Sequence, residues 1–126
     1  MNRLSDEVVE SLVVNNPNLR HLDISSTSYR SDSLSTRSAT TIAENCHQLT
    51  YIEIENCSGF SSNDIQNLIT ACPKLKHASF GWTNIDDIAL GLLSHNCPEL
   101  EHLSLASCGN VSEQGVEGFI SVALKL

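Results

Sequence analysis

The sequence predicts an α/β fold in which similar units stack into a solenoid, with about four parallel strands on the concave face and helices on the convex face. Three observations lead to this prediction. One phrase recurs, as in CPKLKHASFGWTN from Cys72 and CPELEHLSLASCGN from Cys97. Within each phrase, apolar and polar residues alternate as in a half-buried strand. After each phrase, a capping residue precedes apolar residues at helical spacing. Recurrence at a fixed period is typical of stacked repeats.

Each predicted strand is positioned by a recurring leucine, at Leu19, Leu49, Leu75 and Leu100, with steps of 30, 26 and 25 residues. We number strand positions from this leucine. Positions +3 and +5 are apolar, whereas +2 and +4 are mostly polar, so we expect +3 and +5 to point into the core. The apolar residues are Leu22 and Ile24, Ile52 and Ile54, Ala78 and Phe80, and Leu103 and Leu105.

Each predicted helix begins with an apolar residue followed by an N-cap, and we number helix positions from that apolar residue. The N-caps at position 1 are Ser35, Ser61, Asp86 and Ser112, and Ser61 with Asp64 approximates a capping box. Positions 5, 8 and often 9 are apolar, which defines a single buried face. The start of the chain follows the same rule, with Leu4, Ser5, Val9, Leu12 and Val13.

We therefore expect residues 1–126 to form one repeat domain. Its parts are a partial-repeat helix at 1–15, whose strand is missing, and repeats at 16–45, 46–71, 72–96 and 97–126. The repeat 16–45 contains a longer segment rich in Ser and Thr, Ser25–Ser38. This segment is either a functional loop open to phosphorylation or a simple insertion.

Composition limits the classes of partner. The formal net charge is −8 with scattered acidic residues, and clustered Lys and Arg, which nucleic acids and anionic membranes require, are missing. A basic protein or peptide is the partner that this charge favours. No apolar run is long enough for a membrane span, and Asp6 and Glu7 argue against a signal peptide. The five cysteines include no CxxC pair, which indicates a reducing compartment, cytoplasmic or nuclear.

The pattern CPxLxxLxLxxC, followed by an apolar residue, Ser or Thr, and Asp or Glu, resembles the cysteine-containing leucine-rich repeats of F-box/LRR proteins. The resemblance extends from Leu4 to about Ile120. It implies a substrate receptor of an SCF ubiquitin ligase. The segment LSDEVVESLV at Leu4–Val13 is superficially similar to the opening of an F-box, but a repeat strand follows it directly. We therefore expect either a fragment of a longer receptor, with the F-box outside this chain, or a short protein without its own ligase adaptor.

The candidate binding residues lie at polar positions of the predicted concave face. Position +2 carries a ladder of rings, for which a protein contact, an inert surface and a metal site are the alternatives; a third ligand beside His77 and His102 is lacking. Positions +4 and +6 carry Glu53 and Glu55, which favour recognition of Lys or Arg over acid–base catalysis, because no nucleophile accompanies them. The candidates are His21, Asp23, Tyr51, Glu53, Glu55, His77, Ser79, Trp82, His102 and Ser104.

Trp82, the single tryptophan, occupies position +7, where the other repeats have Ser or Asn. It is either an exposed binding residue or a ring folded back over its own loop. The recurrence of cysteine at equivalent positions indicates packing rather than nucleophilic chemistry. We therefore expect a protein-recognition module with no enzymatic activity, no cofactor and no metal. The alternatives are a free-standing adaptor or inhibitor that binds a basic protein, and a metal-binding or enzymatic protein that uses His77 and His102.

Overall fold

Helices and strands alternate along the chain. The computed structural model describes residues 4–25 and 34–123, so most of the predicted Ser25–Ser38 loop lies outside the described residues. The elements are α1 (Asp6–Val14), β1 (His21–Asp23), α2 (Thr36–Asn45), β2 (Tyr51–Glu53), α3 (Ser62–Ala71), β3 (His77–Ser79), α4 (Asp87–Asn96), β4 (His102–Ser104) and α5 (Glu113–Ala123).

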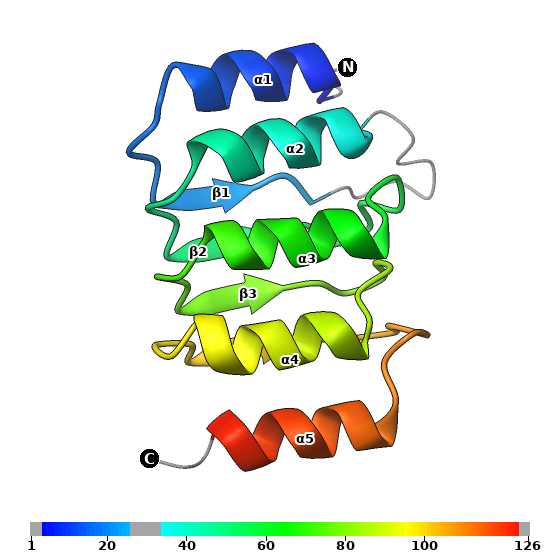
Figure 1. Ribbon diagram of the computed structural model, residues 1–126. Coiled ribbons are helices and arrows are strands. Elements are labelled where there is room, and N and C mark those ends of the chain that lie inside the picture. Colours follow the sequence, from blue (N-terminus) through cyan, green and yellow to red (C-terminus); the bar gives the residue numbers. More distant parts are fainter. Residues whose placement is uncertain (1–3, 26–33, 124–126) are drawn as a thin grey trace.

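The four strands form one parallel sheet in the order β1-β2-β3-β4, so each strand pairs with its neighbours in sequence. Each helix likewise packs against the next helix along the chain (Figure 1). The register aligns the same strand position of successive repeats, for example His77 with His102. The predicted α/β class, with four parallel strands and helices on one side of the sheet, is confirmed at this level.

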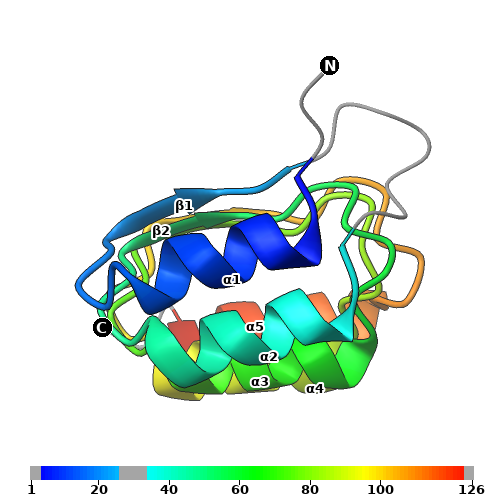
Figure 2. The same ribbon diagram turned by 90° about the horizontal axis from the view of Figure 1, so that it is seen from above.

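Helix α1 covers the N-terminal end of the core. Figure 2 shows it between the strand layer and the layer formed by the other helices. Its Val9 and Val13 side chains are completely buried there. Leu12, which we expected in the core, is 40 % exposed. Leu12 occupies helix position 8, which faces the preceding repeat. Because no preceding repeat lies among the described residues, the Leu12 side chain is partly exposed to solvent.

All five predicted helix starts are confirmed. The side chains of Ser5, Ser35, Ser61 and Asp86 each accept a hydrogen bond from a backbone N–H in the first turn of their helix. Ser112 Oγ accepts one from Gly115 N at 3.0 Å. Such bonds satisfy the N–H groups that a helix leaves without partners. The capping box of Ser61 and Asp64 is complete, with both reciprocal bonds present.

Neighbouring helix starts are also joined to each other, which the sequence analysis did not predict. Asp6 accepts hydrogen bonds from Ser35 N at 3.0 Å and Ser35 Oγ at 2.6 Å. Asp87 accepts the equivalent pair from Ser112 at 2.9 and 2.6 Å. Although burial raises the pKa of Asp6, the hydrogen bonds from Ser35 and Ser38 are sufficient to hold it below its usual value. The carboxylate of one repeat thus helps to fix the start of the next helix.

The core follows the predicted alternation in the central repeats. The side chains at positions +3 and +5 of the first three repeat strands are at most 3 % exposed, and so are all those at helix positions 5 and 8 of α2, α3 and α4. In the last repeat, the apolar side chains are less buried than the sequence pattern predicts. Leu103 and Leu105 are only partly buried, α5 has no buried residue, and Ile120 is 45 % exposed. Each central repeat buries its apolar face against both neighbours, whereas the described residues place a neighbour on only one side of the last repeat.

The recurring cysteines form hydrogen bonds between repeats. Cys46, Cys72 and Cys97 are the C-cap residues of α2, α3 and α4. Cys72 Sγ donates to the carbonyl oxygen of Cys46 at 3.3 Å, and Cys97 Sγ donates to that of Cys72 at 3.4 Å. A thiol therefore fills a small buried site and also satisfies a backbone oxygen at the end of the preceding helix. This geometry explains why cysteine recurs at this position.

We expect four of the five thiols to react slowly in the native protein near pH 8. Burial raises the pKa of Cys57 and Cys72 to about 12 and that of Cys97 to about 11, so the reactive thiolate is scarce. Burial also raises the pKa of Cys46. Cys108 is only partly buried. Timed labelling with an aromatic disulfide, followed by peptide mapping, checks this expectation against a urea-denatured control. Rapid labelling of any of the four buried thiols would contradict it.

Replacement of Gly59 by alanine should destabilise the fold. A Cβ at this position would lie 2.2 Å from the backbone oxygen of Leu34, a distance that real Cβ atoms do not adopt. The backbone must move, so we expect a loss of about 1–3 kcal/mol in the free energy of unfolding. Gly91→Ala is the matched control, since a Cβ there meets nothing within 4 Å and alanine favours a helix. Urea denaturation of both variants measures the difference, and equal stabilities would refute the close approach at Gly59.

Candidate protein-binding face

The face of the sheet that points away from the helices carries the predicted ladder of rings. We call this surface the open sheet face, formed by strand positions +2, +4 and +6. The parallel register places His21, Tyr51, His77 and His102 side by side, as predicted. The rings of His21 and Tyr51 are stacked with centroids 3.7 Å apart, and those of Tyr51 and His77 with centroids 4.2 Å apart. His77 and His102 are farther apart, at 5.7 Å, and tilted by 42°.

Glu53 joins this ladder into a polar network. The Tyr51 hydroxyl donates a hydrogen bond to Glu53 Oε1, and His77 Nε2 lies 3.4 Å from the same oxygen. The bond to Glu53 raises the pKa of Tyr51 to about 12, so its hydroxyl remains a proton donor at neutral pH. The side chain of Glu53 is 25 % exposed. The network therefore holds a carboxylate in a fixed position while part of it still meets solvent.

Glu55 is held in a similar way by the neighbouring strand. Ser79 Oγ donates to Glu55 Oε2 at 2.5 Å, and Ser25 Oγ accepts a hydrogen bond from Glu55 N at 3.0 Å. Ser79 is only 3 % exposed. The inclusion of Ser79 among the contact residues therefore requires correction: it positions Glu55 and does not itself meet solvent. Gly81 has no side chain, and Glu55 Oε2 would lie only 3.2 Å from a Cβ at this position. The Glu55 side chain therefore has room to lie across β3 and cover Ser79.

The charge on the open sheet face is uneven. Asp23, Glu53 and Glu55 lie on β1, on β2 and just after β2, whereas the equivalent positions on and just after β4 carry Ser104 and Ala106. Exposed cations also precede two of the four strands, which the sequence pattern did not predict. Arg20 and Lys76 lie at position +1 before β1 and β3, whereas Thr50 and Glu101 occupy that position before β2 and β4. A ligand on this face would therefore meet negative charge toward the strand ends of the N-terminal half.

Trp82 lies at the edge of the open sheet face and is 60 % exposed, so its ring is not folded back over its own loop. Its backbone is left-handed, with φ of 58°, and its N–H donates to the carbonyl oxygen of Ala106 at 2.9 Å. Asn56 and Ser107, at the same strand position, have φ of 65° and 55°. Asparagine is common in this conformation, but a bulky ring is not. Asn56 was the sequence signal that could have revealed this backbone requirement.

The small residues at position +8, which are Cys57, Thr83 and Cys108 in the described repeats, form hydrogen bonds with backbone oxygens. Thr83 Oγ1 donates to Phe80 O at 2.6 Å, and Cys108 Sγ donates to the same oxygen at 3.1 Å. Cys57 Sγ donates to Ile24 O at 3.5 Å. These bonds help to fix the turns that follow β2, β3 and β4, and therefore the edge on which Trp82 lies.

Within residues 4–25 and 34–123, no three His, Cys, Asp or Glu side chains are grouped so that they could hold a metal ion. Among the described helices, none is long and apolar enough to cross a membrane. An open hollow of about 550 Å³ lies on the loop between α1 and β1, and Asn15, Pro17 and Arg20 are among its lining residues. It reaches the ladder only at His21. The chemistry that the open sheet face offers is therefore hydrogen bonding, ring contacts and pairing with cations.

Comparison with known proteins supports the fold and extends no further. No protein-family model matches the sequence, and no curated protein matches it. Among solved structures, Rad7 in the yeast Rad7–Elc1 complex superposes with a TM-score of 0.71 at 14 % identity, over 94 % of this chain and 28 % of Rad7. The C-terminal domain of Caenorhabditis elegans tropomodulin superposes with a TM-score of 0.54 at 10 % identity, over 95 % of this chain and 92 % of that domain. The chain thus spans about a quarter of the length of Rad7.

Proposed function

We propose that this chain is a leucine-rich-repeat solenoid that recognises a protein, and that the open sheet face binds a basic segment of that protein. The observation that carries the proposal is the fixed position of Glu53 and Glu55. Each carboxylate is oriented by a hydroxyl group, and Glu53 lies within a ladder of stacked rings. Oriented carboxylates pair well with Lys and Arg, and planar rings favour a guanidinium group. Trp82 provides an exposed aromatic side chain at the edge of this surface.

The resemblance to F-box/LRR repeats supports a role in substrate capture for ubiquitination, and the fold similarity to Rad7 is consistent with a role in protein interaction. In this proposal the chain acts in the cytoplasm or nucleus, has no catalytic role of its own, and reaches a ligase through an F-box outside this chain. The alternative is a free-standing adaptor or inhibitor that uses the same acidic face. Co-purification with a ligase adaptor subunit distinguishes the two.

Charge reversal on the open sheet face tests the proposal. Partners are first recovered by affinity purification and mass spectrometry, and their affinity is then measured with purified proteins. Glu53→Lys with Glu55→Lys should abolish binding, because two fixed carboxylates become like charges against a basic segment. The control is Glu44→Lys with Glu99→Lys, which changes the net charge equally at two exposed positions outside the open sheet face. Binding that survives the first pair and fails with the second would refute the proposal.

A further inference from the structure

The carboxylates of Glu53 and Glu55 form a row along the open sheet face. Glu53 is the last residue of β2. The chain stays extended through Glu55, because Ile54 N and Asn56 N both donate to carbonyl oxygens of the neighbouring strand segment at 3.0 Å. Residues two apart in an extended chain point to the same side and lie about 6.5 Å from each other. The backbone therefore sets the spacing of this row.

Both glutamate side chains lean toward the next strand by the same offset. In the register Glu53 is paired with Ser79, but its Oε1 lies 3.4 Å from His77 Nε2, two residues nearer the start of β3. If the same register continues, Glu55 is opposite Gly81, but its Oε2 accepts a hydrogen bond from Ser79 Oγ, again two residues nearer the start. The shared offset preserves the two-residue spacing between the carboxylates themselves.

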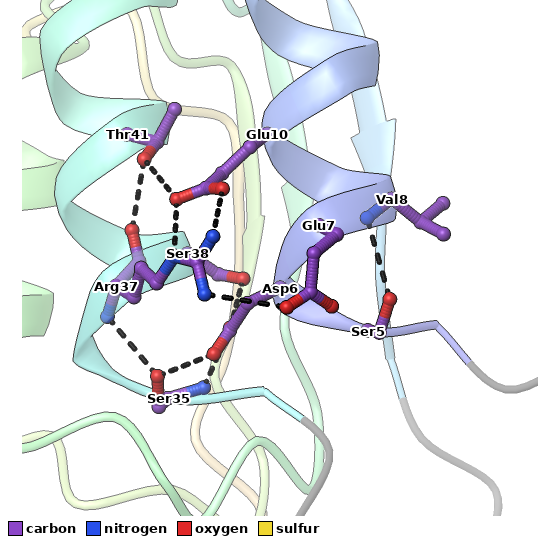
Figure 3. Close-up of polar contacts among 9 residues, drawn as sticks. All are labelled: Ser5, Asp6, Glu7, Val8, Glu10, Ser35, Arg37, Ser38 and Thr41. Carbon is purple, nitrogen blue, oxygen red and sulfur yellow. Dashed lines mark hydrogen bonds and ion pairs between the residues drawn. The ribbon is translucent and has the colours of Figure 1, made fainter.

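The described part of the chain does not neutralise this row. On the helix side of the molecule, each oxygen of Glu10 accepts a hydrogen bond from the Arg37 guanidinium at 2.7 Å (Figure 3). On the open sheet face, His77 is the only ion-pairing group beside Glu53 within residues 4–25 and 34–123, and Glu55 has no ion pair there. Two like charges held at this spacing repel each other, and two bound cations would relieve that repulsion.

The remainder of the open sheet face favours an extended occupant over a helix. Among its described side chains at positions +2, +4 and +6, the only aliphatic group is the methyl group of Ala106. A helix that folds against a partner needs an apolar groove to compensate for the cost of ordering it. An extended segment needs no such groove and places alternate side chains on one side, again about 6.5 Å apart. The small side chains of Ser104 and Ala106 leave room for its backbone beside the row.

We infer that the open sheet face selects an extended segment in which two basic side chains are separated by one residue, so that one cation pairs with Glu53 and the other with Glu55. This inference rests on the proposed function and specifies its ligand. Adjacent basic residues would point to opposite sides of an extended chain, so only one of them could reach the row. Trp82 is 60 % exposed just beyond the row, where its ring would contact the segment after the second cation.

Three peptides of identical composition test the spacing. Each contains two arginines within alanine and glycine, arranged as Arg-Ala-Arg, as Arg-Arg, or as Arg-Ala-Ala-Ala-Arg, and the last has the spacing of one helix face. Their affinities for the full chain are measured by NMR titration up to millimolar peptide. The Arg-Ala-Arg peptide should bind at least about fivefold more tightly than the Arg-Arg peptide, because the latter forms one charge-assisted hydrogen-bonded pair fewer.

Neutral variants of the protein assign the preference to the two carboxylates. In Glu53→Gln and in Glu55→Gln the preference for Arg-Ala-Arg over Arg-Arg should be lost, because one ion pair remains for either peptide. Ser79→Ala removes the hydroxyl group that orients Glu55 without changing the charge, so the preference should shrink while the affinity for Arg-Arg stays nearly the same. Glu44→Gln, at an exposed position of α2, is the matched control and should retain the preference. Thermal melts of each variant check that the fold is unchanged.

The possible outcomes separate this inference from the proposed function. Equal affinity for all three peptides, lost in the Glu53→Lys, Glu55→Lys variant, would overturn the spacing and leave the proposed function intact. The same holds if Arg-Ala-Ala-Ala-Arg binds most tightly, since the occupant would then be a helix. A preference for Arg-Ala-Arg that both glutamine variants retain would also refute the pairing inferred here. Absence of binding by every peptide, or binding that survives the charge reversal, would overturn both proposals.

Discussion

Ile52→Asp should abolish folding, whereas Leu103→Asp should leave a folded but weaker protein. The two residues occupy the same strand position, but Ile52 is 1 % exposed between two repeats, and Leu103 is only partly buried on the last strand. At position 52, a buried carboxylate would lose its hydration and gain no compensating hydrogen bond, which costs several kcal/mol in the free energy of unfolding. At position 103, water can still reach the carboxylate, so the loss of folding stability is smaller.

Circular dichroism and urea denaturation of the two variants measure this difference. Ile52→Ala and Leu103→Ala provide the matched neutral pair, with an expected loss of about 2–5 kcal/mol for the first and clearly less for the second. If both aspartate variants unfold equally, the last repeat is covered in solution. A native-like melt for Ile52→Asp would refute the strand register itself.

The central repeats could be predicted from the sequence because their pattern is local. Alternation at positions +3 and +5 and the N-caps at Ser35, Ser61, Asp86 and Ser112 depend on backbone geometry that each repeat forms independently. The burial of Leu12, Leu103 and Ile120 could not be predicted in the same way, because it depends on whether a neighbour covers them. A repeat pattern predicts whether a side chain points toward the core, but it does not predict how many repeats pack against that side chain.

The candidate site was predicted only in part for a related reason. The alignment of His21, Tyr51, His77 and His102 follows from the register, so position alone was sufficient. The bonds that orient Glu53 and Glu55 come from neighbouring side chains whose rotamers the pattern does not specify. The bond between Asp6 and Ser35 likewise joins residues 29 positions apart, across the approach of two helices.

Replacement of Trp82 by asparagine should separate binding from stability. The left-handed backbone at this position costs a bulky residue about 1 kcal/mol or more, whereas Asn56 adopts it in the preceding repeat. The ring is 60 % exposed, so its loss removes little packing from the core. We therefore expect Trp82→Asn to be as stable as the native protein or more stable. If this result is obtained, stability does not require the exposed tryptophan, and we expect its ring to contact a partner instead.

Binding of the partner recovered on the open sheet face should weaken about 30-fold in Trp82→Asn, which corresponds to about 2 kcal/mol for an aromatic side chain that contacts the partner. Asn56→Trp is the converse control: it introduces the same ring at the equivalent turn of the neighbouring repeat, at a similar conformational cost, and should not restore binding when combined with Trp82→Asn. Calorimetric titration and thermal denaturation of the three variants give both quantities. A large loss of stability in Trp82→Asn would show that the ring supports its own loop, and unchanged affinity would remove Trp82 from the binding face. The combination of unchanged or higher stability with weaker binding is the outcome that a binding residue requires, because a structural residue would lower both together.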